Sequence, residues 1–336
     1  EYCRDEGLRK YWDEYSYPYH KNGEGNNSFR SAMTNKVQKK VDARAYNHNQ
    51  DSFTIENVIR WFDYWRERPG TGDRVSSGGV KIIFSDTNTH YRGVENYRRS
   101  GVTDAMRIPK DPFYAHQVMW DGWVDIENPR IHIVGHWNYK EDVVKPVYVV
   151  SSAEKVELFL NGKSLGNGQR DYHFLYTFKD VAFVPGKLEA VGYDKNGKEC
   201  CRAELQTAGK PEQIKLSVIQ SPKAVSYTHL TLPTNREVMD KDGRRCPLAN
   251  DLIHFDVEGP AEWRGGIAQG KDNYILSKDL PVECGINRAL IRSFTTPGTV
   301  RITAKADGLQ SAEISLSSAP VEVKNGLSNY IPGDEL

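Results

Sequence analysis

Alternation of apolar and polar residues limits the possible fold of this chain more than any other feature, and it runs from about Ile131 onward. Successive side chains of a β-strand point to opposite faces of the sheet, so a period of two indicates strands with one buried face. The alternating runs lead into Asn161-Gly162, Pro185-Gly186 and Asn196-Gly197, which are turn signals typical of hairpins. This region therefore predicts antiparallel β-structure made of short strands.

A second alternating region starts near Gln213, after the candidate linker Gly209-Lys210-Pro211. Short alternating strands with a turn about every ten residues favour an immunoglobulin-like β-sandwich. We therefore expect one such sandwich over residues 140–209 and a second over residues 210–320, followed by a tail at 321–336.

Residues 1–139 have a different pattern, in which helical and strand periods mix. A nearly continuous apolar run at 80–84 predicts a strand buried on both faces of a parallel sheet. The segment 54–68 places its apolar residues on one helical face. Asp111-Pro112 is typical of an N-cap followed by proline at the first helical position. Together these elements form an α/β pattern that is too small to close a sheet by itself.

The charge balance excludes one broad class of partner. Lys and Arg number 45, Asp and Glu also number 45, and the formal net charge is therefore zero. A chain without excess positive charge is not expected to bind nucleic acid, and it has no electrostatic attraction to anionic membranes. No apolar run approaches the roughly 18 residues of a membrane span, so we expect none.

The cysteines do not indicate a metal site or a disulfide framework. They are scattered and odd in number, and they show no CxxC pair or zinc-ligand spacing. We expect structural thiols, no resident metal and no cofactor, because no phosphate-binding or dinucleotide-binding motif occurs either. The five residues are Cys3, Cys200, Cys201, Cys246 and Cys284.

Two motifs resemble glycoside hydrolase family 2, the β-galactosidase family. The first is Ile133-Val-Gly-His-Trp-Asn138, and the second is the hairpin Val156-Glu-Leu-Phe-Leu-Asn-Gly-Lys-Ser-Leu-Gly166. The stretches 253–259 and 296–304 resemble the C-terminal sandwich of the same family. The resemblance implies a mixed fold, in which residues 1–139 are the C-terminal remnant of a (β/α)8 TIM barrel and two immunoglobulin-like β-sandwiches follow. Residues 80–84 would then be the eighth barrel strand.

The resemblance also implies a site. Family members hydrolyse β-glycosides with retention, using two carboxylates about 5–5.5 Å apart. Glu1-Tyr2 matches the context of the nucleophile, so Glu1 is the candidate catalytic residue. Asp86, Asn88 and His90 directly follow the eighth strand, where TIM-barrel chemistry occurs, and are candidate sugar contacts. The alternatives are a solvated terminal carboxylate for Glu1 and loop hydrogen bonding for the other three.

Several aromatic residues have both a functional and a structural interpretation. Trp120, Trp123 and Trp137 could stack on a sugar, but packing of a helix against the first sandwich is the favoured interpretation. The segment 11–19 carries five aromatic residues just after Glu1 and would edge the active site of a barrel.

One segment does not fit the family pattern. Residues 225–238 stand where relatives have an alternating strand, and Pro233 would remove a hydrogen-bond donor in mid-strand. The string resembles translated sequencing-adapter DNA. The alternative is an unusual surface loop of the native protein.

The expected function is that of a fragment of a retaining β-glycosidase, most of all a β-galactosidase, acting on terminal β-linked sugars of plant or algal glycans. β-Glucuronidase and β-mannosidase activities stay open. The second carboxylate is absent from this chain, and general acid help is worth about 10²–10⁴ in rate, so we expect the chain alone to be inactive. The resemblance implies a periplasmic or secreted location. The alternative function is a non-catalytic carbohydrate-binding or adhesion protein of immunoglobulin-like modules.

Overall fold

The computed structural model describes residues 15–16, 83–87, 101–218, 231–269, 272–294 and 296–318. The chain divides into two compact units, Glu1–Thr207 and Ala208–Leu336, and each is described by itself. The expected helix at 54–68 lies outside the described residues, as does most of the expected barrel strand.

The end of that expected strand differs from the prediction. Ser85 forms a parallel bridge with Thr103, but the side chain of Phe84 is 57% exposed and contacts the edge of Phe113 at a ring-centroid distance of 6.2 Å. The prediction that Phe84 is buried on a sheet face is therefore wrong. Apolar character alone did not distinguish a core position from a surface position at the end of the run.

One helix is described in the first unit, α3 (Asp111–Val124). It begins one residue earlier than expected, because Lys110 occupies the N-cap and Asp111 with Pro112 form the first two helical positions. The carboxylate of Asp111 is used elsewhere: it accepts hydrogen bonds from His132 Nε2 at 2.9 Å and from the amide of Gly135 at 3.1 Å. These two bonds tie the start of α3 to the next segment of the chain.

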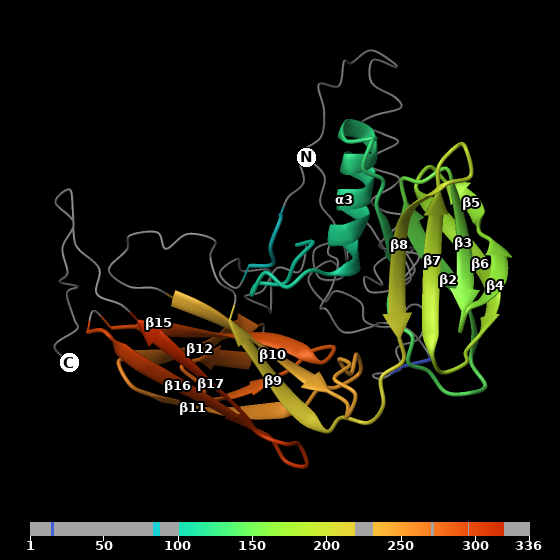
Figure 1. Cartoon of the computed structure of the whole chain (residues 1–336). Helices are drawn as coiled ribbons and strands as arrows, with labels where there is room; N and C mark the ends of the chain where they lie inside the picture. Colours follow the sequence, from blue (N-terminus) through green and yellow to red (C-terminus); the bar gives the residue numbers. More distant parts are fainter. Residues whose placement is uncertain are drawn as a thin grey trace, which may run out of the picture. The chain divides into compact units, whose positions relative to one another are not determined.

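The first unit contains a β-sandwich, beside which α3 lies (Figure 1). Its strands form two four-stranded sheets in the orders β1-β2-β6-β5 and β4-β3-β7-β8. Their bounds are β1 Ile131–Ile133, β2 Val144–Ser151, β3 Lys155–Leu160, β4 Lys163–Asn167, β5 Gln169–Tyr172, β6 Leu175–Ala182, β7 Lys187–Tyr193 and β8 Glu199–Gln206.

The alternating residues of both sheets meet in one core. Val149 and Tyr176 come from the first sheet, and Leu158 and Ala190 come from the second; all four are at most 2% exposed. The outer face of the first sheet is covered by α3, whose Met119 packs in a second cluster of buried residues with Val150 and Leu175 of the sheet.

The hairpin signal at Asn161-Gly162 is confirmed. Leu160 pairs with Lys163 across a two-residue turn, and the φ angles of Asn161 and Gly162 are 52° and 80°. A type I′ turn needs positive φ at both central residues, which Asn-Gly adopts most easily.

The second unit is also a β-sandwich, with sheets in the orders β13-β12-β15-β10-β9 and β14-β11-β16-β17. Val238, Ile253, Ile291 and Ile302 form part of its core and are at most 1% exposed. The strands are β9 Gln213–Val218, β10 Thr231–Met239, β11 Leu252–Glu258, β12 Ala261–Gln269, β13 Asp272–Ile275, β14 Asp279–Pro281, β15 Ile286–Ser293, β16 Gly298–Lys305 and β17 Ala312–Ser318.

Pro233 does not prevent strand formation. It lies within β10, which pairs with β15 on one side and β9 on the other, and Pro233 itself is opposite Leu290 of β15. The described register with β9 begins one residue later, at Thr234. Residues 231–239 thus form a strand although Pro233 provides no backbone donor, and proline is tolerated near the start of a strand.

Candidate functional site

Of the four predicted site residues, one is described. Asp86 follows the bridge at Ser85, while Glu1, Asn88 and His90 lie outside the described residues.

Asp86 belongs to a buried polar cluster. Its amide donates to the carbonyl of Thr103 at 3.0 Å, and the amide of Thr103 donates to the carbonyl of Phe84 at 3.1 Å. The carboxylate Oδ1 accepts from the amide of Gly101 at 2.9 Å and from Lys110 Nζ at 2.9 Å. The Asp86 and Lys110 side chains are 0% and 3% exposed. A buried charge is tolerated only when it is paired and hydrogen-bonded, and both conditions are met here.

Gly101 allows this close approach. A Cβ atom at this position would lie 2.2 Å from the amide nitrogen of Asp86, and the obstructing atoms are backbone, which cannot move aside cheaply. A second aspartate holds the turn at residues 104–108. Asp104 Oδ1 accepts from the amide of Ile108 at 2.8 Å, and Ser85 Oγ donates to the Asp104 carbonyl at 2.8 Å. The carboxylate of Asp86 thus joins residues 83–87 to the segment that precedes α3.

This geometry favours the structural alternative for Asp86. A carboxylate with no exposed side-chain surface, engaged by an ammonium and an amide, organises the loop around it. Substrate contact by Asp86 stays a prediction, as do the roles of Glu1, Asn88 and His90.

A second buried polar cluster surrounds His136. The ring Nδ1 accepts from the amide of Asn138 at 3.1 Å, so in the neutral imidazole Nε2 carries the proton and donates to Ser16 Oγ at 3.1 Å. Burial, and secondarily the charge of Lys145, holds the pKa of His136 well below its usual 6.5. The histidine is therefore neutral at pH 7, and its tautomer is determined by its two partners.

Tyr139 completes this cluster. Its ring stacks on His136 with centroids 4.3 Å apart, and its hydroxyl accepts from Lys145 Nζ at 3.0 Å. The edge of Tyr15 contacts the same ring at 6.5 Å. The described part of the aromatic segment after Glu1 is therefore attached to the end of the first sandwich. From the sequence we weighed a role for Trp137 but assigned none to its neighbour His136, which entered only as part of the motif at 133–138.

The tryptophans agree with packing where they are described. Trp137 is 2% exposed, and its Nε1–H donates to the carbonyl of Val184 at 3.0 Å. Trp120 is half-buried and packs against the cluster formed by α3 and the first sheet.

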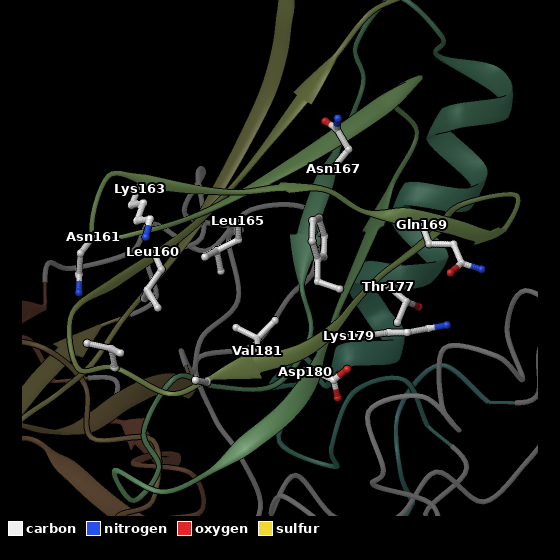
Figure 2. Close-up of a pocket in the computed structure, with 13 residues that line it drawn as sticks. Leu160, Asn161, Lys163, Leu165, Asn167, Gln169, Thr177, Lys179, Asp180 and Val181 are labelled. Atoms are coloured by element: carbon white, nitrogen blue, oxygen red, sulfur yellow. The ribbon is translucent and has the colours of Figure 1, made fainter.

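The first sandwich carries an open groove with a volume of about 690 Å³. It lies between β4 and the second half of β6, and we name it the β4–β6 groove (Figure 2). Lys163 and Leu165 border it from β4, and Lys179 and Asp180 border it from β6. The sequence did not predict a binding role for any residue of this groove; Asn161, Lys163 and Leu165 entered only as parts of the hairpin motif.

Within the described ranges, no group of three or more His, Cys, Asp or Glu residues has a geometry suitable for a metal ion. In the same part of the chain, no helix is long and apolar enough to cross a membrane.

Comparison with known proteins identifies both sandwiches. Residues 142–201 match a domain of unknown function (DUF4982), and residues 234–315 match glycoside hydrolase family 2 C-terminal domain 5. The chain is 34% identical over 336 residues to a β-glucuronidase of Formosa agariphila, a match that covers 99% of this chain and 32% of the relative. It is 30% identical to the β-galactosidase BoGH2A of Bacteroides ovatus, over 65% of this chain and 25% of the relative.

A solved structure is similar to this chain over nearly its whole length. The structure of a β-glucuronidase from glycoside hydrolase family 2 matches with a TM-score of 0.75 and 34% identity, over 98% of this chain and 32% of that one. The chain thus spans a quarter to a third of the length of these curated relatives. The expected resemblance is confirmed, and the chain belongs to glycoside hydrolase family 2.

Proposed function

We propose that this chain is part of a retaining β-glycosidase that cleaves terminal β-linked galactosides or glucuronides of glycans. The observation that carries this proposal is the 34% identity to a β-glucuronidase, which extends over 99% of the chain. A second relative is a β-galactosidase, so the preference for galactosides expected from the sequence is widened to include glucuronides. The alternating strands after residue 140 are proposed to be accessory immunoglobulin-like sandwiches, and residues 1–139 the end of a TIM barrel.

In this proposal Glu1 is the nucleophile. Its carboxylate attacks the anomeric carbon while a second carboxylic acid protonates the departing glycosidic oxygen, and a water molecule then hydrolyses the glycosyl ester with net retention. Asn88 and His90 are proposed to contact sugar hydroxyls. Asp86 is proposed to position their loop, because its carboxylate is bound to Gly101 and Lys110. A periplasmic or secreted location is part of the proposal, since the substrate class is extracellular.

The 336-residue chain alone is proposed to be inactive, because it corresponds to only 32% of the β-glucuronidase it matches. Purified chain is incubated with aryl β-galactoside and aryl β-glucuronide, and aglycone release is followed. The expected result is no release above the uncatalysed rate. Turnover of either substrate would contradict this part of the proposal.

A chimera tests the nucleophile. This chain replaces the matched third of the Formosa agariphila β-glucuronidase, and the chimera is assayed with both aryl glycosides. Glu1→Gln is expected to lower kcat at least about 10³-fold, because no covalent intermediate forms without the carboxylate. Glu6→Gln is the matched control and should retain the activity of the chimera. Equal activity of the Glu1→Gln chimera and its parent would refute the assignment.

A further inference from the structure

The β4–β6 groove is bordered by two strand edges. β5 pairs with β6 through residues up to Thr177, and beyond that point the described ladder of β6 continues with β2 on the opposite side. β4 is the last strand of the other sheet in its described order. The sandwich therefore opens between β4 and residues 178–182, where Lys179, Asp180 and Ala182 are exposed.

A β-bulge changes the direction of two side chains at this opening. Phe178 pairs with Val147 and Val181 pairs with Lys145, so Lys179 and Asp180 together oppose the single residue Pro146. Asp180 has a φ of 53°, in the left-handed region. In a regular strand Asp180 would share the core-facing side with Phe178; the extra residue instead leaves both Lys179 and Asp180 exposed. The bulge thus presents an ammonium and a carboxylate together at the groove.

Most polar side chains of this groove are uncommitted; the exception is Asn161, which donates to the carbonyl of Pro185 at 3.0 Å and accepts from the amide of Lys187 at 2.8 Å. For Lys163, Asn167, Gln169, Lys179 and Asp180 the structure describes no side-chain hydrogen bond or ion pair, and all five are exposed. The Thr177 hydroxyl, at the end of the groove between Gln169 and Lys179 in Figure 2, is buried without a hydrogen-bond partner among the described residues.

Strands β7 and β8 of the same sandwich are arranged differently. There Glu189 is paired with Lys187 at 2.9 Å and with Arg202 at 3.0 Å. The absence of comparable pairs at the groove is therefore a local property and not a general feature of this surface.

Apolar side chains line the rest of the groove. Leu160, Leu165, Val181 and Val184 belong to this lining, and Leu165 and Val184 have 41% and 46% of their surfaces exposed. Such a site offers aliphatic surface for C–H groups, amides that both donate and accept, an ammonium donor and a carboxylate acceptor. A polyhydroxylated ring has the complementary pattern, with apolar C–H faces and hydroxyls at its rim.

We propose that the β4–β6 groove is a non-catalytic oligosaccharide-binding site. An extended peptide is a poorer match, because a bulge and lysines on a strand edge hinder the addition of another strand. The volume of about 690 Å³ lies within the range of small-ligand sites. This site is independent of Glu1 and of the proposed hydrolysis.

The test is an isothermal titration calorimetry experiment on the full 336-residue chain. Two probes are used, a neutral β-linked hexose trisaccharide and a trisaccharide that contains uronic acid. We expect saturable binding of at least one probe with a Kd on the order of 1 mM or below. The double variant Asn167→Ala with Lys179→Ala should weaken binding about tenfold, because two hydrogen-bonding groups are lost. The double variant Asn196→Ala with Lys198→Ala removes the same residue types from an exposed turn between β7 and β8, outside the groove, and should bind like the parent.

Two further results decide between sites. Glu1→Gln should leave the Kd unchanged, which separates this site from the proposed catalytic one even if the hydrolase proposal fails. The inference is overturned if neither probe binds saturably, if the groove variant binds as tightly as the parent, or if Glu1→Gln abolishes binding.

Discussion

The Lys110 ammonium lies 2.9 Å from the Asp86 carboxylate, and the two side chains are 3% and 0% exposed. The residues are 24 positions apart, so their pairing joins the segment before α3 to the end of the expected barrel strand. A pair removed from water in this way is far more sensitive to the loss of one partner than a pair on the surface.

Removing one partner of this pair should therefore destabilise the first unit strongly. Lys110→Met removes the ammonium that pairs with the buried Asp86 carboxylate, which keeps its hydrogen bond from the Gly101 amide, and should lower the free energy of unfolding by about 3–5 kcal/mol. The measurement is the urea midpoint followed by tryptophan fluorescence. The control is Lys278→Met, which breaks an exposed pair with Asp256 and should cost less than about 1 kcal/mol. Similar losses in both variants would show that burial of the Asp86 pair has no energetic weight.

The stability of the chain should fall as the pH falls below about 6.5, because of His136. Burial holds its folded-state pKa well below 6.5. Above that pH both states hold neutral imidazole, whereas below it the unfolded chain binds a proton that the folded chain does not. The free energy of unfolding then decreases by up to about 1.4 kcal/mol for each pH unit, until the folded-state pKa is reached.

The variant His136→Gln tests this origin. Glutamine retains a donor for Ser16 but does not titrate, so the slope of stability between pH 7 and pH 5.5 should become smaller than in the parent, whatever the absolute stability. His173→Gln replaces an exposed histidine of the same unit and is the matched control against which the slope of His136→Gln is compared. An unchanged slope in His136→Gln would assign the pH dependence to other groups.

At Asp180, glycine should destabilise the fold less than valine, whereas at the neighbouring Lys179 the order should be reversed. With φ at 53°, Asp180→Gly relieves the steric cost of a left-handed residue, whereas Asp180→Val adds to it and should cost about 1–2 kcal/mol. At Lys179, which has no left-handed backbone, valine should be tolerated and glycine should destabilise, as in an ordinary strand. Thermal unfolding of the four variants checks this. Equal costs for glycine and valine at Asp180 would contradict the bulge geometry.

Cys201 should resist alkylation in the folded chain. Burial, and secondarily the adjacent Cys200, raises its pKa to about 12, and Cys200 Sγ lies 3.9 Å away. The thiolate is the nucleophile, so at pH 8 the folded thiol should react with iodoacetamide on the order of 10³ times more slowly than the unfolded one, whose pKa is near 9. Peptide mapping after timed labelling gives the two rates. Rapid labelling under native conditions would contradict the burial of the thiol.

The sequence alone determined the features that depend on neighbouring residues. The period of two from Ile131 onward predicted strands, and Asn161-Gly162 predicted a tight turn, because side-chain alternation and the φ preferences of a dipeptide are local properties. The family motifs at 133–138 and 156–166 led to the same family that the comparisons show.

The tertiary structure alone decided which polar groups meet. Ser16 and His136 are 120 positions apart, and no periodicity within either segment specifies their hydrogen bond. The exposure of Phe84, the strand that contains Pro233 and the outward turn of Asp180 each depend on the partner strand or segment alongside. Sequence patterns show which residues prefer burial or extension, but actual burial and pairing depend on which elements lie next to one another. These neighbours are fixed only when segments that are distant in the sequence pack together.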